Sequence, residues 1–382
     1  MKQMICLSDA AWHGLPSRGL PSRTAQLAGR LKNYRILFVD PPEDGSRDGK
    51  GEGEQVNKQV TLLKAPPKGN LARRGGFWNT RYQRKLARFL SERLRDYGFD
   101  KPVLWLTDPA SIALLDRFPH GPVVFDCQKV PIEGVSGPKG SDRKLRQTEA
   151  LARAAQLVIA QSEGARKALS AWNPGTVLVP NGVDFEYFQR ARDESLAFPN
   201  DLFTVKNPIL GHVGTLGEHL ELSFVEKAAA AHPEWSFVFI GEAPETEGVK
   251  RLRTLKNVHF LGVKPQKQLP MYLCRFDVCI SLYRSSEMSR DISPMKLYEY
   301  LASGKPIVST PQPAQTLDYA DVVYIAGTSE EWTEACRKAV MERDAWKVRQ
   351  RMEYAKASSW DARVVDLERA FNEQLALVTE QP

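Results

Sequence analysis

Apolar and polar positions along the chain follow two periods that alternate. Short runs of consecutive apolar residues, typical of strands buried on both faces, are separated by segments in which apolar residues recur at helical spacing. The apolar runs lie at Met4–Leu7, Arg35–Asp40, Val103–Leu106, Val123–Phe125, Leu157–Ala160, Ile209–Val213, Ser236–Ile240, Val258–Leu261, Val278–Ser281 and Ile307–Ser309. This alternation predicts an α/β protein with parallel sheets.

The alternation restarts after a polar stretch near Phe185–Asn207, which predicts two doubly wound halves. We place their bounds at 1–190 and 191–358, followed by an amphipathic helix within 359–382. Further helices are predicted at Ser22–Lys32, Thr80–Tyr97 and Glu221–Ala231, and the charged, Gly-rich stretch 43–58 is predicted to be a mobile surface loop. Parallel sheets bind ligands beyond the carboxyl ends of their strands, so two such halves predict a cleft suited to a two-substrate transfer.

Composition limits the class of protein. The 382 residues are 42% hydrophobic and 26% charged, which is typical of a soluble globular protein. The sequence has no uncharged apolar run of about 18 residues, and Asp9 interrupts the N-terminal stretch before an apolar signal core can form. The five cysteines include no CxxC pair. These features predict a cytoplasmic protein.

The net charge of +7 is concentrated in one segment. Between Lys64 and Lys101 eleven Lys and Arg residues face three Asp and Glu, interleaved with aromatic residues. The segment is interpreted either as a solvated helix face or as a surface attracted to anions, such as the inner face of a membrane or a phosphorylated substrate. No zinc-finger, RRM-like or helix-turn-helix signature accompanies the charge, which argues against nucleic acid.

The most informative segment is SLYRSSEMSRDISPMKLYEYLASGKPIVST, Ser281–Thr310. Ser293 is predicted to be the N-cap of a helix and Pro294 its first residue, with Gly304 closing the helix after Ser303. A helix N-terminus that follows a strand presents free N–H groups and a positive dipole end, which suits a diphosphate.

Four charged residues surround that helix start. Arg290 and Lys296 flank it, Asp291 precedes it where a carboxylate could hold sugar hydroxyls, and Glu299 lies where it could accept hydrogen bonds from a ribose. The alternative interpretation is that Asp291 is an ordinary loop acid and Glu299 a surface acid. The spacing alone does not separate the two.

DISPMKLYEYLASGKPIVST resembles the acid-x7-acid signature of GT-B glycosyltransferases of family 4, which usually begins with Glu where this chain has Asp291. Further segments resemble the same family in the expected order: ILFVDPP, VPNGVDFEYF (Val179–Phe188), GHVGTL…WSFVFIG…VHFLG (Gly211–Gly262) and SSWDARVVDLERAF (Ser358–Phe371). The resemblance is strongest to the bacterial teichuronic-acid and cell-surface polysaccharide subgroup. It implies a GT-B fold with an N-terminal acceptor domain, a C-terminal donor domain and a last helix that packs back on the N-domain.

The resemblance also implies roles for individual residues. Glu299 would contact the donor ribose and Asp291 the transferred sugar, while Asp126, which ends a strand, would contact the sugar or the acceptor hydroxyl unless it is only a strand-end cap. The implied donor-binding set is Gly214, Thr215, Leu216, Gly217, Val263, Lys264, Arg284, Arg290, Ser293, Pro294, Met295, Lys296 and Leu297. Glycines let backbone amides approach a phosphate, although the loop Gly214–Gly217 is also consistent with a plain strand-to-helix turn.

One departure from the family concerns charge. Many members carry an Arg and a Lys just after the Gly loop, whereas this chain reads GEHLELSF there. The nearest remaining cations are Arg284, Arg290 and Lys296. If none of them reaches the diphosphate, donor binding itself is in doubt.

No metal or cofactor is predicted. The six histidines are scattered, and no HExxH, DxD, GxSxG or P-loop motif occurs. The resemblance implies metal-independent, retaining transfer from a nucleotide sugar to a hydroxyl of a polysaccharide or lipid-linked acceptor. Two alternatives remain open at this point: a sugar-nucleotide epimerase of the same fold, and a non-catalytic module that binds sugar nucleotides.

Overall fold

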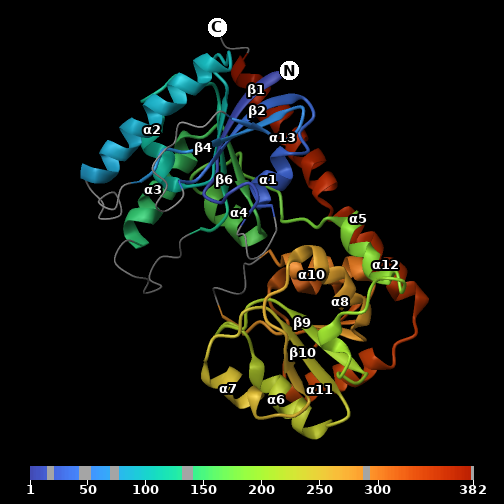
Figure 1. The fold of residues 1–382 in the computed structure, drawn as a ribbon. Helices are drawn as coiled ribbons and strands as arrows, with labels where there is room; N and C mark the ends of the chain where they lie inside the picture. Colours follow the sequence, from blue (N-terminus) through green and yellow to red (C-terminus); the bar gives the residue numbers. More distant parts are fainter. Residues whose placement is uncertain (15–20, 43–52, 69–76, 131–140, 287–292, 380–382) are drawn as a thin grey trace. The chain divides into compact units, whose positions relative to one another are not determined.

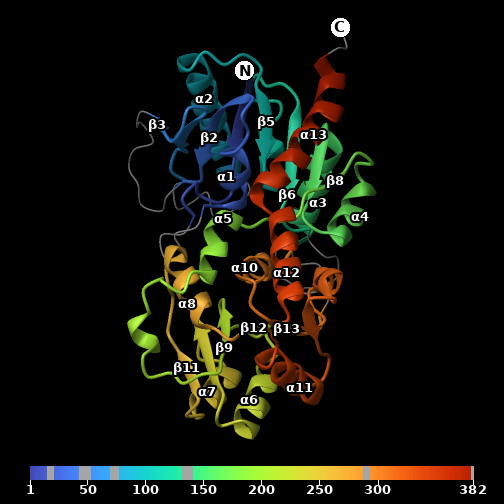
Figure 2. The same cartoon turned by 90° about the vertical axis from the view of Figure 1, so that its right-hand side faces the viewer.

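The computed structural model describes residues 1–14, 21–42, 53–68, 77–130, 141–286 and 293–379. Within these residues the chain forms two compact units. Unit 1 comprises Met1–Gly14, Pro21–Pro180 and the residues from Val364 onward, and unit 2 comprises Asn181–Arg363. Figures 1 and 2 show the ribbon in two views, coloured along the sequence.

The sheet of unit 1 has the strand order β3-β4-β2-β1-β5-β6-β7-β8 among the described residues. Every pairing is parallel except that of β3 with β4. The strands are β1 (Lys2–Leu7), β2 (Tyr34–Asp40), β3 (Glu54–Gln55), β4 (Val60–Lys64), β5 (Val103–Leu106), β6 (Val123–Cys127), β7 (Leu157–Ala160) and β8 (Val177–Leu178).

Helices cover both faces of this sheet because successive side chains of a strand point to opposite faces. The helices are α1 (Arg23–Ala28), α2 (Phe77–Asp96), α3 (Ser141–Ala154), α4 (Glu163–Ser170) and the later part of α13 (Trp360–Thr379). Leu104 and Leu106 share a buried cluster with residues of α2, α3 and α4. Trp105, between them, meets Phe371 of α13 with ring centroids 6.0 Å apart. Figure 2 shows α13 passing over this face.

The sheet of unit 2 is parallel throughout its described residues, in the order β11-β10-β9-β12-β13-β14. Its strands are β9 (Ile209–Val213), β10 (Ser236–Ile240), β11 (Val258–Phe260), β12 (Val278–Ser281), β13 (Ile307–Ser309) and β14 (Val323–Ile325). Its helices are α5 (Phe185–Phe188), α6 (Leu222–Ala231), α7 (Glu247–Arg253), α8 (Leu269–Arg275), α10 (Met295–Ser303), α11 (Ser329–Val340), α12 (Ala345–Ala357) and the start of α13.

Strand β10 separates the two cores of unit 2. Val238 and Ile240 pack in a buried cluster with residues of α8, α10 and α12. Phe237 and Phe239 point the other way, into a cluster with residues of α6, α7 and α11. Figure 1 shows these two helix layers on either side of the sheet. Unit 2 is therefore a doubly wound α/β domain.

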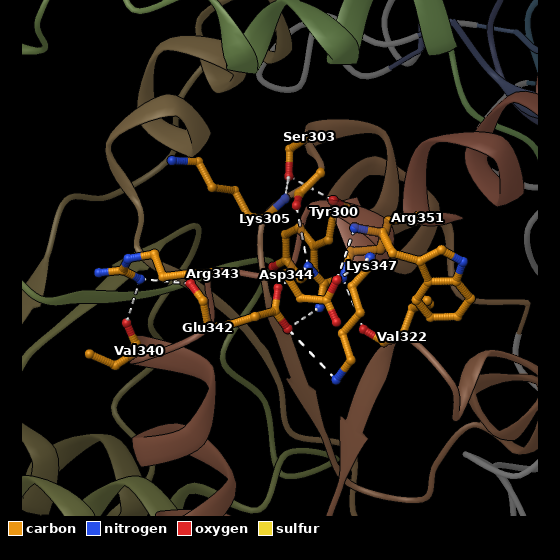
Figure 3. Close-up of polar contacts among 12 residues, drawn as sticks. Tyr300, Ser303, Lys305, Val322, Val340, Glu342, Arg343, Asp344, Lys347 and Arg351 are labelled. Atoms are coloured by element: carbon orange, nitrogen blue, oxygen red, sulfur yellow. Dashed lines mark hydrogen bonds and ion pairs between the residues drawn. The ribbon is translucent and has the colours of Figure 1, made fainter. Parts of the chain in front are cut away.

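A buried ion pair joins several elements of unit 2 (Figure 3). Arg351 of α12 is fully buried and binds Glu342 through two contacts of 2.6 and 2.7 Å. Its guanidinium also donates to the carbonyl of Val322 at 2.9 Å and to that of Gly304, the residue that ends α10, at 3.4 Å. Arg351 therefore anchors the C-terminal end of α10.

The predicted strands coincide with observed strands to within two residues. The loop prediction for 43–58 is wrong for Glu54–Gln55, which form β3. Strands β4, β8 and β14 were not predicted from the sequence. The compact units divide after Pro180 and Arg363, against the predicted bounds of 190 and 358. The core of unit 2 includes Val183, Phe188 and Ala191. Residues 181–190 therefore belong to unit 2 and not to unit 1.

No helix within the described residues is both long enough and apolar enough to cross a membrane.

Candidate functional site

Helix α10 begins one residue later than predicted. Its N-cap is Pro294, and no side chain caps the helix. The prediction that Ser293 is the cap is wrong, because the Ser293 hydroxyl accepts a hydrogen bond from the backbone N–H of Asn181 at 3.0 Å. The Asn181 side-chain amide donates to the Ser293 carbonyl at 3.2 Å, so the Asn-Gly turn fixes the approach to the helix.

The start of α10 presents donors without acceptors. The Leu297 N–H donates to Pro294 at 3.0 Å, whereas the N–H groups of Met295 and Lys296 meet no acceptor among the described residues. Gly304 ends the helix in the left-handed conformation, at φ 70°, as predicted. The uncapped N-terminus therefore carries the positive end of the helix dipole.

Glu299 lies inside the first turns of α10 and is buried, with 3% of its side chain exposed. Its Oε2 pairs with Nζ of Lys296 at 2.8 Å. Tyr300, next along the helix, accepts a hydrogen bond from the Val213 N–H at the end of β9, at 2.8 Å. The helix start is thus tied to the strand whose loop precedes α6.

Three loops that follow neighbouring parallel strands are joined by backbone hydrogen bonds. Gly214 donates to Ile240 at 2.8 Å, Leu216 to Glu242 at 2.8 Å, and Gly241 to Gly262 at 2.9 Å. The N–H groups of the residues on either side of Thr215 are both hydrogen-bonded, whereas the N–H of Thr215 has no acceptor within the described residues. Within the described residues, the Thr215 amide is therefore available to a ligand.

Gly241 is required where two of these loops touch. Its φ is +145°, and a Cβ added there would lie 2.1 Å from the Gly214 carbonyl oxygen. No side chain fits at that distance, so the close approach of the loops depends on glycine.

These loops and the start of α10 surround a pocket that is open to solvent, with an empty volume of about 750 Å³. Its lining is Val213, Gly214, Thr215, Ile240, Gly241, Glu242, Val263, Lys264, Gln266, Leu269, Met295 and Lys296. The pocket lies beyond the carboxyl ends of β9, β10 and β11, where parallel sheets bind ligands.

Lys264 on the pocket wall is held by a polar cluster. Its Nζ lies 2.7 Å from Oδ2 of Asp201, and the Tyr272 hydroxyl donates to the same carboxylate at 3.0 Å. Burial alone would lower the pKa of Lys264, but its bond to Asp201 and the charges of Tyr272 and Asp201 raise it above the ordinary value. Lys264 is therefore a fixed cation whose charge is balanced.

The structure gathers six of the predicted donor-binding residues at this pocket: Gly214, Thr215, Val263, Lys264, Met295 and Lys296. Leu216 and Leu297 are core residues, exposed by 0% and 2%. Gly217 and Arg284 line a different pocket, where Nε of Arg284 lies 3.4 Å from Glu221. Arg290 and Asp291 lie outside the described residues.

Asp126 belongs to unit 1 and is fully buried within β6. Its Oδ2 pairs with Nε of Arg23 at 3.2 Å, and Arg23 also donates to the carbonyls of Pro180 and Val179 at 2.9 and 2.6 Å. Burial raises the pKa of Asp126, and the charge and hydrogen bond of Arg23 oppose that rise. The strand continues through Cys127, so Asp126 is no strand-end cap, and a role in transfer stays a prediction.

The sequence reading missed Gly241, Glu242 and Gln266 on the pocket wall, and His212 behind it. Gly241 follows the apolar run SFVFI directly, in the same way that Gly214 and Gly262 follow theirs. That repetition of glycine at strand ends was the available signal. Gln266 has no comparable signal, because it lies in a polar stretch.

Comparisons with known proteins agree with this geometry. Residues 207–342 match the family model described as glycosyl transferases group 1. The whole chain superposes on the trehalose-phosphate synthase of Burkholderia vietnamiensis with a TM-score of 0.71 at 15% identity, covering 100% of this chain and 99% of that one. The sucrose-phosphate synthase of Thermosynechococcus elongatus gives a TM-score of 0.70 at 14% identity, covering 99% and 100%.

A third structure, HepE of Anabaena in complex with UDP and glucose, gives a TM-score of 0.67 at 17% identity, covering 98% of this chain and 100% of that one. Fold and family match together identify the chain as a glycosyltransferase of the GT-B fold. Among individual proteins, it is 26% identical over 341 residues to TuaH of Bacillus subtilis, assigned as a teichuronic acid biosynthesis glycosyltransferase. That match covers 84% of this chain and 83% of TuaH.

Proposed function

We propose that this glycosyltransferase transfers a sugar, with retention of configuration, from a nucleotide sugar to a hydroxyl of a polysaccharide or lipid-linked acceptor. The observation that carries the proposal is the pocket of unit 2 at the ends of three parallel strands. It is lined by Lys296, which pairs with the buried Glu299, and by backbone amides that have no acceptor among the described residues. A nucleotide sugar offers the complementary groups: a base, a ribose and a diphosphate.

The donor would bind with its diphosphate at the N–H groups of Thr215, Met295 and Lys296, where the helix dipole favours negative charge. Glu299 would accept hydrogen bonds from the ribose hydroxyls, and the base would lie against Val263. The complex of HepE with UDP and glucose supports a donor of this kind.

In the transfer, the bond between the sugar carbon and the diphosphate oxygen breaks while a bond to the acceptor oxygen forms on the same face. The acceptor proton passes to the departing phosphate oxygen. The start of α10 and Lys296 would stabilise the negative charge that develops on the nucleoside diphosphate. Asp291 would hold the transferred sugar. We propose that this chemistry needs no bound cation, so a chelator should leave the rate unchanged.

The similarity to TuaH supports a cell-surface polysaccharide as the acceptor. Contact with the inner face of an anionic membrane would bring the enzyme to such an acceptor. The exposed basic residues of α2 support this contact: Arg81, Arg84, Lys85, Arg88 and Arg95. Flotation with phosphatidylglycerol vesicles at low salt tests it, and equal binding to neutral vesicles would contradict it.

A thermal-shift screen against UDP-, GDP-, ADP- and TDP-sugars tests donor binding. The matching donor should raise the melting temperature, since a ligand at a hundred times its Kd adds about 2.7 kcal/mol to the free energy of unfolding. The anomeric configuration of the product, read by NMR, then tests retention. Conversion of the nucleotide sugar without an acceptor would contradict the proposed transfer.

A further inference from the structure

The described residues that line the pocket offer little uncompensated positive charge to a diphosphate. Among the described residues that line it, Lys296 is paired with Glu299 at 2.8 Å and Lys264 with Asp201 at 2.7 Å. Arg284 lines another pocket. A nucleotide sugar brings two negative charges, so another positive group would strengthen its binding.

His212 lies behind the pocket wall, near the end of β9, and only 6% of it is exposed. Its Nδ1 is 3.0 Å from the Ile280 carbonyl oxygen. A carbonyl only accepts, so Nδ1 carries the proton and Nε2 of the neutral ring is an acceptor. Nε2 faces Gly214 on the pocket wall: a Cβ added to Gly214 would lie 3.1 Å from it. The missing side chain leaves this nitrogen next to the loop that would hold the phosphates.

The groups around His212 keep it neutral in the free protein. The ring of Phe239 on β10 lies 6.0 Å away, and the titratable groups that act on it are Lys296 of α10 and His219 of the following loop. Burial, opposed by the bond to Ile280 and helped by Lys296 and His219, lowers the pKa of His212 to about 4.

We propose that His212 takes up a proton when the diphosphate of the donor binds beside Gly214 and Lys296, and that its imidazolium supplies positive charge that the described residues of the pocket lack. The inference rests on the proposed function. It assigns a binding role to a core histidine through its position behind the loop Gly214–Gly217, which would hold the diphosphate.

The physical cause is the change in local charge. A diphosphate next to Lys296 cancels the positive field that opposes protonation, and its own charge attracts a proton to Nε2. Binding and protonation are then linked, so the affinity for the donor should increase as the pH falls below the pKa that His212 has in the complex.

Calorimetric titration with UDP-glucose, or with whichever of the four nucleotide sugars stabilises the chain, tests this linkage. Titrations at about pH 6 in two buffers of different ionisation enthalpy measure the protons taken up on binding. The phosphates of a nucleotide sugar are fully ionised in this range, so uptake reports on the protein. The variant is His212→Gln, and the control is His259→Gln, a half-buried histidine of β11 in the same unit.

The expected result is proton uptake by the wild type and by His259→Gln, with none by His212→Gln and about tenfold weaker binding by that variant. Binding without proton uptake by the wild type would overturn this inference and leave the proposed donor site intact. Failure of the wild type to bind any of the four nucleotide sugars would overturn both. The wild-type measurement decides the question even if His212→Gln fails to fold.

Discussion

The carboxylate of Glu299 has different partners in the free protein and in the proposed donor complex. In the free protein its carboxylate is buried against Lys296, and in the proposed complex it accepts ribose hydroxyls. Glu299→Gln keeps the size of the side chain but weakens both interactions. We expect the donor to raise the melting temperature of this variant far less than that of the wild type.

The matched control for that experiment is Glu330→Gln. Glu330 also pairs with a lysine of unit 2, Lys227, at 3.5 Å, but 79% of its side chain is exposed. Exposed pairs contribute little, so its stability and its response to donor should equal those of the wild type. Equal donor responses of the two variants would show that Glu299 does not contact the donor.

Gly241 gives a prediction about shape rather than charge. Gly241→Ala places a Cβ against the Gly214 carbonyl and adds strain at a φ of +145°. We expect the free energy of unfolding to fall by about 2 kcal/mol or more. We also expect donor binding to be lost, because the loop Gly214–Gly217 must move to make room for the new Cβ. In the control Gly327→Ala, the nearest atom would be 3.8 Å from the new Cβ, and urea unfolding should resemble the wild type.

For single residues, the sequence predicted which side chains are candidates for the site better than it predicted their hydrogen-bond partners. The family signature located the start of α10 and Glu299, but Ser293 misled as a cap because its hydroxyl is used by Asn181, far away in the chain. Arg284 lines a different pocket, beside Glu221. Such long-range partners leave no trace in local spacing.

Helix α10 is held at both ends, and its C-terminal anchor can be tested. Arg351→Met leaves the Glu342 side chain, only 4% exposed, with Lys347 at 3.9 Å as its remaining cation. Loss of one member of a buried pair typically costs about 3–5 kcal/mol, so we expect a large drop in the free energy of unfolding.

The double variant Arg351→Met, Glu342→Met removes the buried carboxylate as well. It should be more stable than Arg351→Met alone, which chemical denaturation can measure. The exposed pair of Arg337 and Glu334 provides the control, and Arg337→Met should change stability by less than about 1 kcal/mol. A double variant less stable than the single would contradict this account of the anchor.

The strands that could be predicted from the sequence are those that are buried on both faces of a sheet. Strands such as β9 and β10 are covered on both faces and read as unbroken apolar runs. Strand β4, VTLLK, lies near the edge and follows a polar stretch, and β3 is two exposed residues whose strand state depends only on pairing with β4. The spacing of apolar residues can be recognised in the local sequence, but the strand with which a segment pairs cannot.

The stability of the whole chain should depend on pH through His212. Its pKa is about 4 when folded against an ordinary value of 6.5, so the unfolded chain binds a proton that the folded chain rejects. Stability is therefore complete above pH 6.5 and falls as the pH drops toward 4. Between pH 7 and pH 5 this group should cost the wild type about 2 kcal/mol.

His212→Gln should lose correspondingly less stability over that range, as measured by urea unfolding at both pH values. The control is His232→Gln, since His232 lies beside Glu234 with 28% of its side chain exposed and is less buried than His212. An identical loss in the wild type and in His212→Gln would contradict the neutral, buried state of this histidine.

The central claim for the whole molecule is that unit 2 holds the nucleotide sugar at the start of α10. Hydrogen–deuterium exchange, with and without the stabilising nucleotide sugar, tests it most directly, because the amides of Thr215, Met295 and Lys296 have no acceptor among the described residues. The account predicts slower exchange on donor binding in the peptides that contain these three amides. Donor-dependent protection confined to other peptides, with these unchanged, would contradict it.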